Sequence, residues 1–314
     1  MIGNKWCLRL SLVVVCMIAV FPFTAHAESF TYTSINYPGA FRTIPNDIND
    51  YGQIAGYYGT ATGDHGFIYN GSSFDSIDYP GADYTYAYGI NNSGNIVGAY
   101  YDVFWNEHGF IYTGSSFSVV DYPGADYTYV YDVNNNGLII GNYGTMTGDY
   151  GFIYNGNSFV SLGYPGAIFT FAYGINDYGQ IVGAYYDASW NEYGFLYDGG
   201  AFSSITYPGA WNTEVSTINN RGQIVGTYYD ASWNEHGFFY NGSSFSSIEY
   251  PGAWNTEISG INNNGHIVGS YSNLSGGSAF SATPVPEPCP FFLLSAGLGM
   301  VCLIVRHKMK ATSL

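Results

Sequence analysis

The chain is 314 residues long and rich in small and aromatic residues, with 42 Gly, 33 Tyr and 21 Phe, while only 10% of its residues are charged. Residues 28–284 carry 22 acidic side chains against Arg42 and Arg221, a formal charge of −20. Such an acidic body repels phosphate backbones and anionic lipid heads, which excludes nucleic-acid binding and peripheral membrane binding. Because aromatic residues favour strands and glycine favours tight turns, the composition predicts many short strands.

The first 27 residues have the pattern of a secretory signal peptide. Lys5 and Arg9 precede an apolar run over residues 10–23, and Ala25-His26-Ala27 follows as a cleavage site. The alternative is an N-terminal membrane anchor, for which this apolar run is short. We therefore expect the mature chain to begin at Glu28 and to fold outside the cytoplasm. Residues 28–284 contain no cysteine, so core burial and chain closure must hold them together.

Residues 28–284 are built from an internal repeat. Tyr-Pro-Gly-Ala begins at six positions spaced 42 or 43 residues apart, namely Tyr37, Tyr79, Tyr122, Tyr164, Tyr207 and Tyr250. In the unit from Tyr207, four β-prone segments cover residues 214–218, 223–229, 237–240 and 244–250, and Asn-Gly-type turns separate the first pair and the last pair. Four antiparallel strands in about 43 residues are typical of a propeller blade.

The two ends of the repeat region complement each other. The sixth unit ends after its third strand, at Phe280, whereas Ser29–Asn36 precede Tyr37 as a lone strand. An N-terminal strand that completes the last blade would close the ring and remove exposed edges. The sequence therefore predicts an all-β, six-bladed β-propeller over residues 28–284. Through their INxxGxIVG core and the following His-Gly-Phe, the units also resemble the HAF-type extracellular repeats of bacteria, which implies an extracellular location.

The long connections of the predicted blades bring the aromatic residues to one face. The connections between strands two and three, and those that follow strand four, emerge at the same end of a four-stranded meander. They carry all five tryptophans of the repeat region and three aspartates: Trp105, Trp190, Trp211, Trp233, Trp254, Asp102, Asp187 and Asp230. This set predicts a face that stacks on sugar rings and bonds to hydroxyls. The alternative is that these rings pack between neighbouring blades.

Three acidic pairs in the same connections raise the question of a metal. The pairs are Asp102 with Glu107, Asp187 with Glu192, and Asp230 with Glu235. Oxygen ligands suit Ca²⁺, but the EF-hand spacing is absent, and solvated surface carboxylates are the simpler interpretation. We expect no other cofactor.

The sequence offers no catalytic constellation. His65, His108 and His236 share a repeat position with Tyr150 and Tyr193, which disfavours a ligand or general base there. The recurring threonines are expected to make turn or inter-blade hydrogen bonds; they are Thr43, Thr85, Thr128, Thr170, Thr213 and Thr256. No carboxylate stands out from the repeat background, so we do not expect an enzyme.

The last 30 residues form a tail in three parts. Val285, Pro286, Glu287 and Pro288 come first, residues 289–305 are uncharged and long enough for a short membrane helix, and Arg306, Lys308 and Lys310 end the chain. This order resembles the PEP-CTERM sorting signal of bacterial exported proteins. The resemblance implies recognition by a membrane exosortase, cleavage near Pro-Glu-Pro and transfer to the cell surface. The alternative is a plain membrane anchor with its basic end in the cytoplasm.

Together these features predict a surface-sorted, non-enzymatic propeller of the bacterial envelope or exopolysaccharide matrix. Its expected partners are an exosortase and an envelope glycan. The alternative from another class is a secreted glycan-active enzyme, which requires two carboxylates that converge from non-equivalent positions of the repeat.

Overall fold

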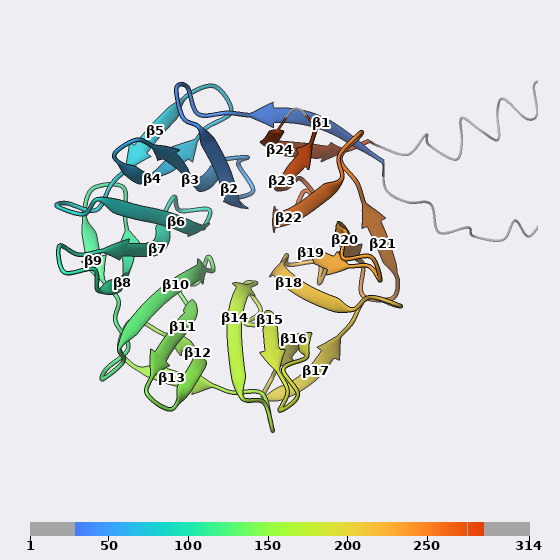
Figure 1. The fold of residues 1–314 in the computed structure, drawn as a ribbon. Coiled ribbons are helices and arrows are strands. Elements are labelled where there is room, and N and C mark those ends of the chain that lie inside the picture. The colour runs from blue at the N-terminus through green and yellow to red at the C-terminus, as the bar shows by residue number, and fades with distance from the viewer. Residues whose placement is uncertain (1–28, 275, 286–314) are drawn as a thin grey trace, which may run out of the picture.

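A computed structural model describes residues 29–274 and 276–285 of the protein. In these residues 24 strands form six antiparallel sheets of four strands, arranged around a central axis (Figure 1). The sheets are the blades of a propeller, and we number them 1 to 6 in chain order. None of the described residues forms a helix that is long and apolar enough to span a membrane. The predicted signal peptide and the predicted membrane segment over residues 289–305 lie outside the described residues.

Each blade starts with its innermost strand and runs outward. Blades 1 to 3 contain β2 (Arg42–Ile48), β3 (Ile54–Thr60), β4 (Gly63–Tyr69) and β5 (Phe74–Ile77); β6 (Tyr84–Ile90), β7 (Ile96–Tyr101), β8 (Glu107–Tyr112) and β9 (Phe117–Val119); and β10 (Tyr127–Val133), β11 (Ile139–Thr145), β12 (Gly148–Tyr154) and β13 (Phe159–Leu162).

Blades 4 and 5 repeat this order, and blade 6 takes its outermost strand from the N-terminus. These blades contain β14 (Phe169–Ile175), β15 (Ile181–Tyr186), β16 (Glu192–Asp198) and β17 (Ala201–Ile205); β18 (Asn212–Ile218), β19 (Ile224–Tyr229), β20 (Glu235–Tyr240) and β21 (Phe245–Ile248); and β22 (Asn255–Ile261), β23 (Ile267–Asn273), β24 (Gly276–Pro284) and β1 (Phe30–Ile35). Strand β21 ends before the predicted boundary at Tyr250, because Tyr250 already accepts the turn hydrogen bond of Ala253.

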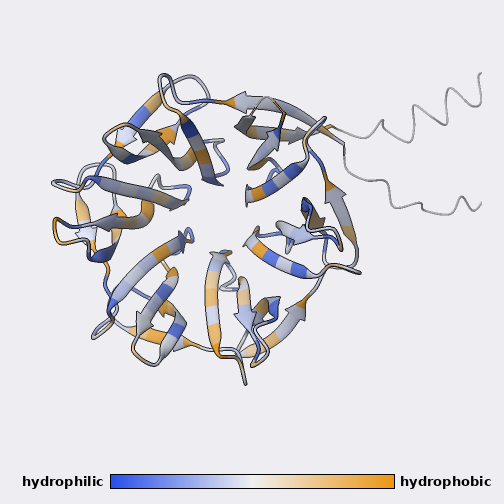
Figure 2. Cartoon of the chain, in the orientation of Figure 1, coloured by the Kyte–Doolittle hydropathy of each residue, from blue (hydrophilic) through white to orange (hydrophobic). Residues whose placement is uncertain are grey.

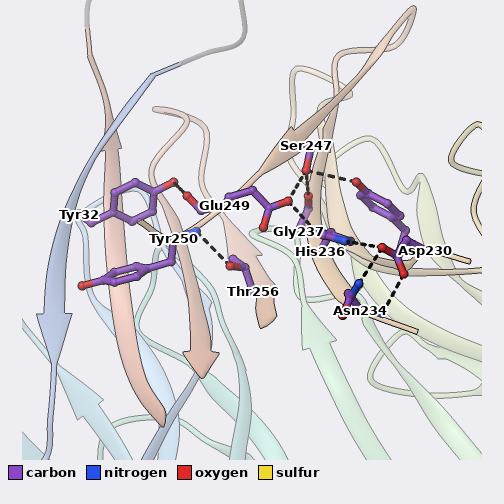
Figure 3. A network of polar contacts seen from close by, with 10 residues as sticks. Tyr32, Asp230, Asn234, His236, Gly237, Ser247, Glu249, Tyr250 and Thr256 are labelled. Atoms are coloured by element: carbon purple, nitrogen blue, oxygen red, sulfur yellow. Dashed lines mark hydrogen bonds and ion pairs between the residues drawn. The ribbon is translucent and has the colours of Figure 1, made fainter. Parts of the chain in front are cut away.

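The shared blade predicted from the sequence is confirmed. Strand β1 pairs antiparallel with β24, from Phe30 opposite Pro284 to Ile35 opposite Ala279. On β1, Tyr32 packs its ring 5.4 Å from Phe280, just as Phe245 packs 5.6 Å from Phe238 in blade 5. Its hydroxyl donates a hydrogen bond to the backbone oxygen of Glu249 in the neighbouring blade, at 3.1 Å (Figure 3). The N-terminal strand thus closes the ring with both backbone and side-chain contacts.

The core lies between the blades and follows the repeat. Six phenylalanines at the same place in the unit are completely buried, namely Phe67, Phe110, Phe152, Phe195, Phe238 and Phe280. Each ring sits over a glycine of the second strand; a Cβ at Gly226 would overlap the carbonyl oxygen of Glu214 and lie 2.9 Å from the Phe238 ring. Figure 2 shows hydrophobic residues interspersed with more hydrophilic ones in all six blades. This packing explains why the glycine and the phenylalanine recur together.

A second repeated element joins each blade to the next. The Tyr-Pro-Gly-Ala tyrosine stacks on a tyrosine of the second strand, as in Tyr207 and Tyr228, whose centroids are 3.7 Å apart with nearly parallel planes. Its backbone N–H donates to the hydroxyl of the recurring threonine, at 3.0 Å for Tyr207 and Thr213. All six units make this bond, which confirms the turn role predicted for the threonines.

Two closed rings of hydrogen bonds surround the axis at the turns between first and second strands. In the inner ring, the side-chain Nδ2 of one asparagine donates to the backbone oxygen of its equivalent in the next blade, at 2.9–3.2 Å; the members are Asn49, Asn91, Asn134, Asn176, Asn219 and Asn262. In the second ring, a backbone N–H donates to the next side chain, through Asp50, Asn92, Asn135, Asp177, Asn220 and Asn263. The cavity they enclose measures about 60 Å³. Its polar groups are used in closure, so we assign it a structural role.

Candidate ligand-binding face

The face opposite these rings carries three hairpin loops with the same hydrogen-bond pattern, in blades 2, 4 and 5. In blade 2, the N–H of Asp102 donates to the oxygen of Asn106 and the N–H of Trp105 donates to the oxygen of Asp102, both at 3.0 Å. The Asp102 carboxylate accepts the backbone N–H groups of Phe104 and Asn106 and the side-chain amide of Asn106. These donors, Asn106 foremost, lower the pKa of Asp102 to about 2. Asp187 and Asp230 hold their loops in the same way.

The aspartates therefore shape the loops. The glutamate of each predicted Ca²⁺ pair does not share the partners of the aspartate. Glu192, for example, accepts a hydrogen bond from the side-chain amide of Asn212 at 2.7 Å. Among the described residues no group of three or more His, Cys, Asp or Glu side chains is arranged to hold a metal ion. The geometry gives the Ca²⁺ hypothesis no support.

The loops place three tryptophans in a left-handed backbone conformation. Trp105, Trp190 and Trp233 have φ of 67°, 64° and 65°, and within the described residues every other residue with positive φ is a glycine. The same loop frame occurs in the turn after Asn49, where the N–H of Gly52 donates to the oxygen of Asn49 and Gly52 has φ of 78°. Tryptophan thus occupies a position that suits glycine, and the left-handed region disfavours any residue with a Cβ.

The five indole rings of this face are exposed, as the sugar-stacking prediction requires. Their exposed fractions run from 58% for Trp254 to 68% for Trp190. The alternative, that the rings pack between neighbouring blades, is wrong, because the rings are largely exposed and their ring contacts are with residues of the same blade. Trp233 stacks on Trp211 at 5.9 Å, Trp105 lies 5.4 Å from Tyr84, and Trp190 lies 5.5 Å from Phe169. Blades 2, 4 and 5 therefore each carry an exposed tryptophan beside a second aromatic ring, which is exposed in blade 5 and half-buried in blades 2 and 4.

The histidines at the shared repeat position have acidic partners in the same blade. His236 contacts Glu249 through Nδ1 at 2.8 Å and Asp230 through Nε2 at 3.4 Å (Figure 3). His108 joins Asp121 and Asp102 in the same way, and His65 contacts Asp78. These contacts link the hairpin loop to the end of the outermost strand, in keeping with the structural role predicted for these histidines.

The sequence analysis missed two carboxylates that break the repeat. Glu214 and Glu257 take the same place in the innermost strands of blades 5 and 6, where the other four blades have Ile44, Tyr86, Tyr129 and Phe171. Burial raises the pKa of Glu214 to about 7, and the charges of Glu192, Glu257 and Glu235 add to the effect. Burial also raises the pKa of Glu235, and the charge of Glu257 is the second cause of this shift. The differing residue types, Glu against Tyr or Ile, were the available signal.

A pocket of about 330 Å³ opens on the same face between blade 6 and blade 1. It exists because blade 6 carries smaller residues than the other units. Gly277 stands where the others have Asp or Glu, and Ser278 stands where they have His or Tyr. Blades 1, 3 and 6 have no long loop between their second and third strands. In blades 1 and 3 the side chains of Arg42 and Tyr127 fill the space, whereas Asn255, at the same position of blade 6, is too short to do so. Glu235, Glu257 and Arg42 line the opening, and its size lies at the lower end for small-molecule sites.

The predicted sorting motif lies almost wholly outside the described residues. Val285 donates its N–H to the backbone oxygen of Ser29 at 2.8 Å, so the strand pair of blade 6 extends to the motif. Pro286, Glu287 and Pro288, and the basic residues Arg306, Lys308 and Lys310, lie outside that range. The sorting signal stays a prediction.

These features define the class: a closed six-bladed β-propeller with an aromatic and acidic face. No protein-family model matches the chain and no curated protein matches it in sequence, so the PEP-CTERM and HAF resemblances remain predictions.

Solved structures of other proteins share the fold. TolB from Acinetobacter baumannii is 11% identical over 75% of this chain, with a TM-score of 0.54, and the chain covers 64% of it. An Aleuria aurantia lectin mutant in complex with Fucα1-6GlcNAc is 10% identical, with 79% of this chain and 98% of the lectin covered and a TM-score of 0.48. A virginiamycin B lyase from Staphylococcus aureus is 9% identical, with 82% and 100% covered and a TM-score of 0.46. At 11% identity the likeness to TolB shows the fold alone, so function has to be argued from the site.

Proposed function

We propose that this chain is an exported, non-enzymatic propeller that binds a glycan through its tryptophan face, in the bacterial envelope or its exopolysaccharide matrix. The observation that carries the proposal is the left-handed backbone of Trp105, Trp190 and Trp233. Glycine would serve these loops at lower cost, and strained residues persist where they serve a function. Exposed aromatic rings beside carboxylates and amides suit a sugar, whose apolar face stacks on a ring while its hydroxyls bond to polar groups.

The export route belongs to the same proposal. The signal peptide over residues 1–27 and the tail over residues 285–314 support secretion and processing by an exosortase, with the chain anchored by residues 289–305 until it is sorted. The acidic body, which repels anionic membrane surfaces, fits a protein held at the cell surface by its tail rather than by lipid contacts.

A glycan array probed with the full-length protein in detergent tests the binding function. We expect binding to at least one glycan, and a loss of about tenfold or more with Trp233→Gly, which keeps the loop conformation, and with Trp211→Ala. Tyr178→Ala is the matched control, because Tyr178 is an exposed aromatic residue on the opposite face. Equal binding by all variants, or binding to no glycan, would contradict the proposal.

One observation favours a glycan-active enzyme as the second candidate. Glu214 and Glu235 are carboxylates from non-equivalent positions, each with a raised pKa, as a general acid in glycoside hydrolysis requires. Release of reducing ends from a bound glycan, abolished by Glu214→Gln, would establish this alternative. Tight binding without any such release would favour the binding module.

A further inference from the structure

The acidic side chains at the pocket between blades 6 and 1 are not neutralised by basic side chains of the described residues. Glu235 and Glu257 both line this pocket, and the charge of Glu257 adds to the effect of burial in raising the pKa of Glu235. Arg42 is the one basic side chain at the pocket among the described residues, and its Nη2 is bound to Asp64 at 2.5 Å. The carboxylates therefore repel one another without a cation of the protein to relieve them, which makes the pocket complementary to a positively charged group.

The hydroxyl group beside Glu257 points to a ligand that donates hydrogen bonds. Ser270 also lines the pocket, lies directly opposite Glu257 across the strand pair and donates to its Oε2 at 3.0 Å. Because the proton of this hydroxyl is already used on the carboxylate, the oxygen atoms of Ser270 and Glu257 can only accept further hydrogen bonds.

The other wall of the pocket suits an organic cation better than a metal ion. Phe41, which lines the pocket, is 71% exposed. Aromatic faces attract ammonium groups. Where the structure describes the chain, no cluster of carboxylates and imidazoles has the arrangement of a metal site. A ligand that brings its own N–H and O–H donors fits hydroxyl, carboxylate and ring surfaces together.

We propose that this pocket binds the protonated amine of an amino sugar, so that the glycan recognised by the tryptophan face is a cationic, de-N-acetylated hexosamine polymer. This inference rests on the proposed glycan-binding function and names its ligand class. The long-range charge agrees with it, because a body with 22 acidic residues and two arginines attracts a polycation and repels a polysaccharide of uronic acids.

Matched oligosaccharides of glucosamine and N-acetylglucosamine, titrated calorimetrically into the full-length protein in detergent, test the inference. At a pH where the amine is protonated, we expect the glucosamine oligomer to bind about tenfold more tightly, or about 1.4 kcal/mol. Glu257→Gln and Glu235→Gln should abolish this preference. Asp75→Asn, an exposed carboxylate of β5 outside the pocket, controls for net charge.

The outcomes separate this inference from the function on which it rests. Equal, tryptophan-dependent binding of both oligomers would overturn the amino-sugar site and leave glycan binding standing. A preference for a uronic-acid oligomer, lost on Arg42→Gln, would overturn it in favour of an anionic ligand. Absence of binding to every glycan would overturn both, whereas loss of the preference with Asp75→Asn as well would reduce it to a general charge effect.

Discussion

The strained tryptophan loops make a prediction about the order of two small residues. Trp190→Ala and Trp190→Gly both remove the indole and its contact with Phe169, so they differ only in how the backbone tolerates φ of 64°. A Cβ in the left-handed conformation costs about 1–2 kcal/mol, while glycine loses about 0.5–1 kcal/mol more conformational entropy on folding. We expect the glycine variant to be more stable by about 0.5–1 kcal/mol.

The matched control is Trp254, which is also exposed but does not have positive φ. There the order should reverse, with alanine more stable than glycine by about 0.5–1 kcal/mol. Thermal unfolding of the four variants measures both differences, at about 2–4 °C per kcal/mol for a domain of this size. If alanine equals or exceeds glycine at Trp190, the loop is not strained and the reason for proposing a function there is lost.

Three further predictions concern closure, pH and sorting. Asn134→Asp keeps the side-chain oxygen that accepts the turn hydrogen bond but removes the Nδ2 donor to the backbone oxygen of Asn176. Chemical denaturation should therefore show a free energy of unfolding lower by about 1–3 kcal/mol. A decrease below about 0.5 kcal/mol would contradict a role of the asparagine ring in closure. The pKa of Glu214 is raised by folding, so the folded protein keeps a proton that the unfolded chain releases near pH 4.3, and the contribution of this group to stability falls between about pH 4 and 7. We therefore expect Glu214→Gln to raise the melting temperature at about pH 8 but not at about pH 4. Equal shifts at both pH values would refute the assignment. Replacing Pro286 and Glu287 should leave an uncleaved membrane species on immunoblots of cell fractions, and unchanged processing would refute exosortase recognition.

The fold was predictable because the period of the repeat and its turn residues together specify the geometry of a blade. A period of about 43 residues with two Asn-Gly-type turns specifies a four-stranded blade, and the missing fourth strand of the last unit matches the lone strand at Phe30–Ile35. Glycines at fixed places, such as Gly226 beneath Phe238, tie the strands to one packing arrangement. Only strand ends differed, by about two residues, where turn hydrogen bonds compete with the ladder.

The site was predictable only in part. The shared face of the tryptophans followed from the topology, but the topology did not decide between exposed rings and rings packed between blades. Their left-handed backbone was not predicted, because a bulky residue at a glycine position has no sequence signature. Glu214 and Glu257 were missed because alternation along a strand shows where a polar residue lies on the strand but not that its carboxylate is partly buried. The pocket exists because blade 6 has the small residues Gly277 and Ser278 where the other blades have larger ones. In a comparison of the repeats these substitutions look like a degraded copy and do not indicate a pocket.

The central claim is that the three strained tryptophans serve a ligand. Its most direct test is a calorimetric titration of the best glycan from the array into the variant Trp105→Gly/Trp190→Gly/Trp233→Gly, compared with the unmodified protein. Since glycine suits these loops, we expect a variant that is folded and binds at least about tenfold more weakly. A folded variant with unchanged affinity would contradict the account.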